Sequence, residues 1–373
     1  MSRILFYSEA WGQGGIEAFI RNIAPSLVSN GHEIDIFSTW EWKGIEEPDL
    51  DRLGIQRSSV FHGCRPNQAK RLFSGVRAFE KKIKVGRYDT VWINTMNGMG
   101  FLYARAAQRF GVPNRVVHSH NSDVGSGMRV IKRFVGRVGS ILLRQYSTCN
   151  LACSKAAGEY LFGGEHFEIV PNGVDIKRFT FSRESRKHVR EELGVCDSEV
   201  LIGNIGRINF QKNPLFQVRV FAEYLKINPM AKYLMLGKSD MEQEVYQLAR
   251  DLNIADNMII LNPVSNAAPY YSALDALLMP SLFEGLSFSK IEAQCAGLPI
   301  VCSDNMSAES DITDLVHRCN LNDSARSWAN KLSDAISSGN SLRDEMYAQI
   351  VSDSGYSLQS CIDFVLQVLN AGI

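Results

Sequence analysis

Short apolar segments alternate with helical stretches through both halves of this chain. Each segment is short, rich in branched apolar residues and bounded by turn-forming residues, which is the pattern of a buried strand. Strands that alternate with helices pair in parallel and are covered by the helices on both faces. The chain is therefore expected to be an α/β protein with two parallel sheets. The expected strands are 4–7, 33–37, 90–93, 116–117, 200–205, 233–236, 258–261, 276–279 and 299–301.

The chain is long enough for two domains. At 373 residues each half can bury a core of its own. The stretch 176–198 is charged and weakly periodic at its start, so we place the linker there. The expected domains are 1–176 and 177–354, followed by a last helix within 355–373.

No apolar run approaches the length of about 18 residues that a bilayer requires, and the chain enters its first strand directly, so a cytosolic protein is expected.

A strand, a glycine turn and a short helix follow one another in the segment MPSLFEGLSFSKIEAQCAGLPIV. Gly285 breaks the chain, and 287–296 reads as a helix closed by Gly297. The first turn of a helix presents unpaired N–H groups and a positive dipole end, which suit a phosphate. Glu284 lies on the loop before this helix. Glu292, just over a turn inside it, can accept hydrogen bonds from a pair of ribose hydroxyls.

Two cations follow an earlier strand of the same half, in LIGNIGRINFQKNP. Arg207 with its planar fork and Lys212 as a point charge can clamp a diphosphate, as a magnesium ion does in other nucleotide enzymes. Each motif taken alone would be ordinary surface charge. Their occurrence together, in this order, predicts a nucleotide diphosphate site that uses no metal.

These motifs resemble those of the family 4 retaining glycosyltransferases, which have the two-domain GT-B fold. The similar segments of the C-terminal half are GRINFQKNP, LMLGKSD, the run from LNPV through YYSALDALLMPS, and the Glu-x7-Glu segment that ends AGLPIVCSD. The N-terminal segment RILFYSEAWGQGGIEAFIRNIAPSLVSNGHEIDIFS is similar to that family's opening strand, glycine loop and first helix. HSHNSD and IVPNGVDIKRF resemble the branch that builds bacterial capsules and exopolysaccharides. The resemblance spans almost the whole chain.

The resemblance implies two Rossmann-like, doubly wound domains that face each other across a cleft, with the last helix crossing back to the N-terminal domain. The N-terminal domain would bind the acceptor and the C-terminal domain the donor. The implied enzyme is a retaining hexosyltransferase of EC class 2.4 that moves a sugar from a nucleoside diphosphate, with uridine favoured, to a hydroxyl of a glycan acceptor carried on a polyprenyl diphosphate. No cofactor, metal or nucleic-acid partner is expected. The expected donor contacts are Gly14, Gly15, Arg207, Lys212, Val264, Glu284, Gly285, Leu286, Ser287 and Glu292.

Two histidines are candidates for the active-site histidine. By position in the family pattern His120 matches that residue, His118 is its nearest rival, and we expect both to lie just past a strand end. A neutral imidazole there can hydrogen-bond a hydroxyl of the donor sugar. With Glu284, Arg207 and Lys212, His120 completes the expected catalytic set, while His118 and Asn121 are candidate acceptor or sugar contacts.

The sequence departs from the family pattern at two positions. Asn94 stands where many members carry a histidine, and Asn262 replaces a common glycine before Val264. The first departure concerns the acceptor contacts and the second the fit around the base.

Other functions stay open at this point. The glycines at 12, 14 and 15 follow the first strand, as in a dinucleotide dehydrogenase, but they lack the third glycine of G-x-G-x-x-G. A nucleotide-sugar epimerase could use the same fold without an acceptor, and a binding protein would keep Glu292 yet show no turnover. The Asp-x-Asp of Asp49 and Asp51 could indicate a metal, but no strand leads into it, and we interpret it as a solvated acidic loop before a short helix.

The charge is distributed unevenly although the net charge is zero. Residues 1–175 hold 22 Lys and Arg against 16 Asp and Glu, a net charge of +6 that the rest of the chain cancels. Much of the excess lies in 65–87 and in 128–147, where cations mix with apolar residues. Such segments can lie on an anionic membrane, here the inner face of the cell membrane, or approach a phosphate-bearing acceptor. The eight cysteines show no zinc or disulfide spacing and are expected to be buried thiols.

Overall fold

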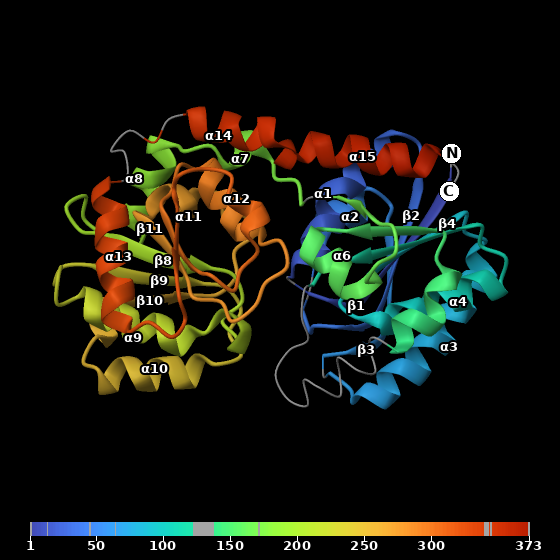
Figure 1. Cartoon of the computed structure of the whole chain (residues 1–373), viewed down its shortest axis with the longest axis horizontal. Coiled ribbons are helices and arrows are strands. Elements are labelled where there is room, and N and C mark those ends of the chain that lie inside the picture. The colour runs from blue at the N-terminus through green and yellow to red at the C-terminus, as the bar shows by residue number, and fades with distance from the viewer. Residues whose placement is uncertain are drawn as a thin grey trace. The chain divides into compact units, whose positions relative to one another are not determined.

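A computed structural model shows two compact units (Figure 1). It describes residues 2–12, 14–44, 46–63, 65–121, 138–170, 172–338, 343 and 345–371. The first unit comprises Met1–Gly173 together with Leu358–Ile373, and the second comprises Val174–Ser357. Chain segments from both ends of the sequence thus belong to the first unit.

The first unit is built on a parallel sheet of seven strands in the order β3-β2-β1-β4-β5-β6-β7. From β1 the chain first adds strands on one side of the sheet and then, from β4 on, on the other side. The boundary between β1 and β4 is therefore a topological switch point. The strands are β1 (Arg3–Trp11), β2 (Glu33–Glu41), β3 (Gln56–His62), β4 (Thr90–Thr95), β5 (Asn114–Ser119), β6 (Cys149–Ala152) and β7 (Glu168–Ile169).

Helices of the first unit pack on this sheet through apolar stripes. Helix α1 places Phe19, Ile20 and Ile23 in the core, and it contacts the last helix of the chain, α15. Helix α3 contacts α4 and strand β2. The helices are α1 (Gly15–Ser29), α2 (Pro48–Arg52), α3 (Gln68–Gly86), α4 (Phe101–Arg109), α6 (Lys155–Phe162) and α15 (Leu358–Asn370), with short turns η1 (Gly98–Gly100) and η2 (Arg144–Tyr146).

The second unit repeats this plan with a parallel sheet of six strands in the order β10-β9-β8-β11-β12-β13. Its switch point lies between β8 and β11. The strands are β8 (Leu201–Ile205), β9 (Lys232–Leu236), β10 (Met258–Leu261), β11 (Ala276–Met279), β12 (Ile300–Ser303) and β13 (Val316–Cys319). The helices are α7 (Ile176–Phe179), α8 (Arg183–Glu192), α9 (Pro214–Tyr224), α10 (Glu242–Asp251), α11 (Ala268–Ala273), α12 (Phe288–Cys295), α13 (Ala325–Ser338) and α14 (Glu345–Val351), with turns η3 (Phe210–Lys212), η4 (Ala255–Asn257), η5 (Ala308–Ser310) and η6 (Ser352–Tyr356).

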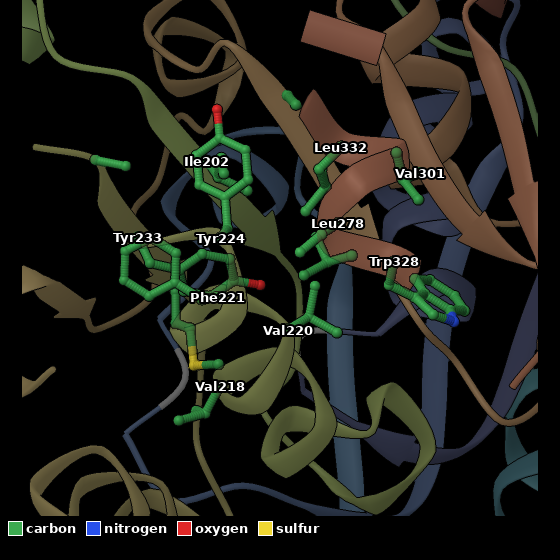
Figure 2. Close-up of a cluster of buried hydrophobic side chains, with 14 of the residues drawn as sticks. Ile202, Val218, Val220, Phe221, Tyr224, Tyr233, Leu278, Val301, Trp328 and Leu332 are labelled. Carbon is green, nitrogen blue, oxygen red and sulfur yellow. The ribbon is translucent and has the colours of Figure 1, made fainter. Parts of the chain in front are cut away.

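One face of the second sheet is covered by α9, α10 and α13. Figure 2 shows this core, in which Phe221 of α9 and Tyr233 of β9 lie with ring centroids 5.1 Å apart. Trp328 of α13 is fully buried in the same cluster. Full burial of a large apolar side chain stabilises the fold by roughly 1.5–3 kcal/mol. This core fixes the strands whose carboxyl ends carry the site described below.

The structure corrects several expectations from the sequence. The proposed linker at 176–198 instead holds α7 and α8 of the second unit, because Val189 and Arg190 are buried against it. The units divide at 173/174 and 357/358. Among the described cysteines, all of them free thiols, Cys196 is exposed rather than buried. Much of the basic segment 128–147 lies outside the described residues. No helix among the described residues is long and apolar enough to cross a membrane.

Candidate functional site

Two loops at the switch point of the second sheet meet through an ion pair. Lys212 follows β8 and Glu284 follows β11, and Lys212 Nζ lies 2.7 Å from Glu284 Oε1. The two side chains are only 13% and 10% exposed. Ligands of open α/β sheets bind at such a switch point, outside the carboxyl ends of the strands. The structure therefore brings together two residues that lie far apart in the sequence of the second unit.

Backbone and side-chain hydrogen bonds hold these loops in place. Leu282 N donates to Gln211 O at 2.8 Å, and Gln211 Nε2 donates to Phe283 O at 3.0 Å. Ser289, at the start of α12, donates its hydroxyl to Ile205 O at 2.8 Å, which joins that helix to the end of β8. The ion pair therefore rests on a rigid frame.

Two glycines allow this frame to form. Gly206 directly follows β8 with φ 146°, and a Cβ there would lie 3.6 Å from Lys212 Cε. Gly237 follows β9 with φ 149°, and a Cβ there would lie 2.1 Å from Gly206 O. These φ values favour glycine, and the second contact leaves no room for a side chain. Gly237, in the segment LMLGKSD, thus sets the path of the chain that carries Arg207.

Arg207 is the cation of this site that is available to a ligand. Its side chain is half-buried and makes no hydrogen bond or ion pair with any residue that the structure describes. The helix α12 begins nearby at Phe288, with Ser287 as its N-cap, and the loop residues Gly285 to Ser287 are buried. A half-buried guanidinium and the free N–H groups of a helix start favour a phosphate ligand.

Glu292 lies inside α12 and is held by a tyrosine. Its Oε2 accepts a hydrogen bond of 2.6 Å from the hydroxyl of Tyr271 in α11. Burial raises the pKa of Glu292 to about 7, although Tyr271 and the positive charges of Arg178 and Lys212 act in the opposite direction. A carboxyl in this position can accept hydrogen bonds from a vicinal diol once it is ionised.

Tyr271 and Arg178 are site residues that sequence reasoning missed, although both lie within segments that resemble the family. Arg178 of α7 donates to Asn266 Oδ1 at 3.0 and 3.1 Å and so fixes the loop that follows β10. Val264 lies on this loop and is 36% exposed. The groups assembled in the second unit can therefore recognise a diphosphate and a diol.

In the first unit, the glycine loop leads into α1. Gly14 is the N-cap of α1 and Gly15 its first residue. A Cβ on Gly14 would lie 2.6 Å from Glu17 Oε2, and Glu17 is only 6% exposed. Gly14 therefore allows the Glu17 carboxylate to fold back over the start of the helix.

The two histidines occupy different environments. His118 lies within β5, not past its end as predicted, and it is fully buried, with Nδ1 3.4 Å from Trp92 Nε1. His120 follows the strand and is half-buried, like Asn121 after it. The ring centroids of His118 and His120 lie 3.9 Å apart. Burial lowers the pKa of His120 to about 3, so its imidazole is neutral at physiological pH.

Asn94 fixes the orientation of His120. It is fully buried in β4 and donates from Nδ2 to Tyr7 O at 3.2 Å. Its Oδ1 is then the acceptor for His120 Nε2, at 2.8 Å. The proton of the neutral imidazole therefore lies on Nε2, which leaves Nδ1 as an acceptor.

The acidic segment near residue 47 has a structural role. Asp49 and Asp51 lie within α2 rather than before a helix, and Asp49 pairs with Arg52 at the surface. The neighbouring Glu47 is buried, pairs with Arg21 and accepts a hydrogen bond of 3.1 Å from Trp11 Nε1. Among the described residues no group of three or more His, Cys, Asp or Glu is arranged to hold a metal.

Comparisons of this chain with protein-family models, related sequences and solved structures find glycosyltransferases. The model of the family "Glycosyltransferase Family 4" matches residues 13–178, and that of "Glycosyl transferases group 1" matches residues 185–350. The "Putative glycosyltransferase EpsF" of Bacillus subtilis (strain 168) is 26% identical over 99% of this chain and 96% of its own length. An Escherichia coli UDP-Gal:alpha-D-GlcNAc-diphosphoundecaprenol alpha-1,3-galactosyltransferase is 26% identical over 60% of each chain. HepE of Anabaena, solved with UDP and glucose, superimposes with a TM-score of 0.79 at 16% identity, covering 99% of this chain and 100% of that one.

Proposed function

We propose that this chain, which belongs to glycosyltransferase family 4 and has the GT-B fold of two Rossmann-like units, moves a sugar from a nucleoside diphosphate to a hydroxyl of a glycan, with retention of the anomeric configuration. One observation carries the proposal: the Lys212–Glu284 ion pair, the loop of Arg207 after β8 and the Tyr271-bound Glu292 of α12 all belong to the switch point between β8 and β11. This set matches the diphosphate and ribose of such a donor.

The leaving group is the part of the donor that needs most stabilisation. We propose that Arg207, Lys212 and the backbone amides of Gly285 to Ser287 neutralise the charge that grows on the diphosphate as the glycosidic bond breaks. Preorganised donors in a partly buried site act strongly, because they need no reorganisation during the reaction. No bound metal has a part in this proposal.

Glu284 connects the phosphate end of the site to the sugar. In the free protein it neutralises Lys212. When a diphosphate takes over Lys212, the Glu284 carboxylate becomes available to hydrogen-bond a hydroxyl of the donor sugar and to position its anomeric carbon. No side chain in this set is assigned as a nucleophile, and the departing phosphate takes the acceptor proton in the proposed step.

His120 is proposed to accept a hydrogen bond from a hydroxyl of the transferred sugar through Nδ1. The hydrogen bond from Nε2 to Asn94 supports this role, because it holds the neutral ring in one tautomer. His118 is fully buried and does not reach solvent, so we assign the contact to His120.

We propose uridine as the base and a lipid-linked diphosphate glycan as the acceptor. The support is that the E. coli relative acts from UDP-Gal on a diphosphoundecaprenol-linked sugar and that HepE binds UDP. Helix α3 supports contact with an anionic membrane, since its Lys70, Arg77, Lys81 and Lys84 are exposed alongside Phe73, which is 72% exposed. A role in exopolysaccharide synthesis and the cytosolic location stay predictions.

The test is calorimetric titration of the protein with UDP, GDP, ADP and NAD in the presence of EDTA. UDP binding that survives EDTA and weakens at least about tenfold in Arg207→Ala is expected, from loss of a charge-assisted contact. Arg219→Ala is the matched control, because Arg219 is exposed on α9 of the same unit. Binding of NAD alone, or of no nucleotide, contradicts the proposal. Release of an altered nucleotide sugar without an acceptor would identify an epimerase instead.

A further inference from the structure

The switch point of the first sheet also carries a pocket, which the proposed function does not yet use. Its lining comes from the carboxyl ends of β1, β2 and β4 and from helices α3 and α4 with turn η1. The cavity volume is about 60 Å³. A water needs roughly 10–15 Å³ on this measure, so the pocket admits several waters or one small polar group of a larger ligand. The lining residues are Tyr7, Glu9, Thr39, Gln68, Arg71, Leu72, Thr95, Asn97, Met99, Gly100 and Tyr103.

Three hydroxyl groups form the inner wall of this pocket. Thr39 Oγ1 lies 3.2 Å from the Tyr7 hydroxyl and 3.0 Å from the Tyr103 hydroxyl. The rings of Tyr7 and Tyr103 are stacked with centroids 3.9 Å apart. Burial raises the pKa of both tyrosines, so their hydroxyls keep their protons. Each hydroxyl can donate one hydrogen bond and accept two, which is also the capacity of a sugar hydroxyl.

The pocket is also lined by an ion pair, whose two charges cancel. Arg71 of α3 pairs with Glu9 of β1, and the two side chains are 12% and 30% exposed. Arg71 Nε is buried and has no hydrogen-bond partner among the described residues. Such a donor is normally satisfied by water or by a ligand. Because Glu9 cancels the charge of Arg71, an anionic ligand gains little here, and a neutral ligand is favoured.

Asn97 supplies further donors. Its Oδ1 accepts from Met99 N at 3.0 Å and caps η1, whereas its Nδ2 makes no hydrogen bond within the part of the chain that the structure describes. Apolar atoms of Leu72 and Met99 complete the lining. Unused N–H donors, a carboxylate, hydroxyls and small apolar surfaces together match the edge of a pyranose ring.

We propose that this pocket receives hydroxyl groups from the edge of one neutral sugar unit, and that this unit belongs to the acceptor glycan. The assignment of this unit to the acceptor rests on the proposed function, whereas the binding of a neutral sugar rests on the pocket alone. The carboxylate of Glu9 would accept from vicinal hydroxyls, and Arg71 Nε and Asn97 Nδ2 would donate to the ring and hydroxyl oxygens. The ligand class is therefore an uncharged hexose or N-acetylhexosamine, not a uronic acid or a sugar phosphate.

The experiment measures binding of methyl glycosides to the full chain by ligand-observed NMR. The probes are methyl glucoside, methyl galactoside, methyl N-acetylglucosaminide, methyl glucuronide and glucose 6-phosphate. At least one neutral glycoside is expected to bind, with a loss of about tenfold or more in Asn97→Asp, which keeps the cap to Met99 N but removes the Nδ2 donors. Asn67→Asp is the matched control, because Asn67 caps α3 in the same way outside the pocket.

A second pair of variants separates the pocket from the surface of α3. Arg71→Met is expected to weaken binding of the neutral glycoside, whereas Arg77→Met, at an exposed position of the same helix, is not. Binding of none of the neutral probes, preference for the charged probes, or equal loss in the variant and its control each overturns the proposal. UDP titration of the same variants keeps the two proposals apart. Normal UDP binding without glycoside binding contradicts this inference alone, and absence of UDP binding contradicts the proposed function alone.

Discussion

Asn94 Oδ1 accepts a hydrogen bond from His120 Nε2 at 2.8 Å, and through this contact the first sheet fixes one tautomer of the histidine. Many members of the family carry a histidine at this position, so Asn94 is a departure from the family pattern. The structure shows that the amide instead bridges β1, through Tyr7 O, and the residue after β5. In the proposed mechanism Asn94 is therefore a positioning residue that acts through His120.

This arrangement predicts that His120 stays neutral over the whole physiological pH range. Burial lowers its pKa to about 3 from an ordinary value of 6.5. Two-bond ¹H–¹⁵N spectra of the imidazoles should show the Nε2–H tautomer without change between about pH 5 and 8. Titration of His120 near 6.5 in the folded protein would contradict the assignment. The same spectra in concentrated urea are the control, since both histidines should then titrate normally.

The lowered pKa of His120 also makes the stability of the protein depend on pH. Between about pH 6.5 and 3 the unfolded chain binds a proton at His120 that the folded chain does not bind. The free energy of unfolding should therefore fall as the pH drops through this window, and the effect should be absent above it. Urea denaturation of the protein and of His120→Phe as a function of pH measures this contribution. A slope that is equal in both proteins would contradict it.

The ion pair between Lys212 and Glu284 predicts opposite effects on binding and on turnover. In Glu284→Gln the ammonium of Lys212 loses its competing carboxylate, so UDP should bind tighter by about 1 kcal/mol, or roughly fivefold. Sugar transfer should fall by about a hundredfold, because the contact to the donor sugar is weakened. Calorimetry and a transfer assay measure the two effects. Glu223→Gln, which breaks the surface pair with Lys226, should change neither.

The elements around the site were largely predictable. Residues 276–279 and the helix closed by Gly297 were placed within about a residue, because glycines and proline mark their ends. Strands β3, β6, β7 and β13 were missed, because they are short or carry no apolar run. Strands β3, β7 and β13 lie at sheet edges, where propensity is weak, and they form by pairing with β2, β6 and β12.

The site itself was less predictable than its frame. The motifs named Arg207, Lys212, Glu284 and Glu292, but no spacing showed that Lys212 and Glu284 would pair. Nor could the sequence separate the two histidines. Strand β5 runs two residues further than the apolar pair 116–117, and this places His118 inside the core. Contacts between distant segments depend on the register of the sheet, which a single sequence does not reveal.

Glu292 predicts a pH dependence of donor binding. Its pKa of about 7 means that the population of the ionised form, which is the form proposed to accept hydrogen bonds from the ribose, grows between about pH 6 and 8. Affinity for UDP-glucose, which has no phosphate that titrates in this range, should rise with pH. In Glu292→Gln the affinity should fall about tenfold and lose this dependence. Calorimetry at several pH values tests both, and a flat profile for the native protein would contradict the role.

Tyr271 is expected to set the pH at which UDP-glucose binding changes. Its hydroxyl donates to Glu292 and lowers the pKa of the carboxyl, so Tyr271→Phe should move the midpoint of the UDP-glucose binding profile to higher pH. Tyr246→Phe is the control, because Tyr246 is an exposed tyrosine of α10 in the same unit, and Tyr271 is the tyrosine that donates to Glu292. A midpoint that stays in place, or moves down, would show that the hydrogen bond does not stabilise the ionised carboxyl.

A substitution at Gly237 is expected to weaken donor binding through the loop that carries Arg207, although it removes no polar group. In Gly237→Ala the new Cβ would lie 2.1 Å from Gly206 O, so the loop that carries Arg207 must move. We expect a loss of more than about 3 kcal/mol in the stability of the second unit and little UDP binding. Gly194→Ala is the control, because Gly194 also has a positive φ, 66°, but open space around it. That variant should cost about 1 kcal/mol by urea denaturation and bind UDP normally. Equal losses in the two variants would mean that backbone strain, not the contact with Gly206, makes glycine necessary at 237.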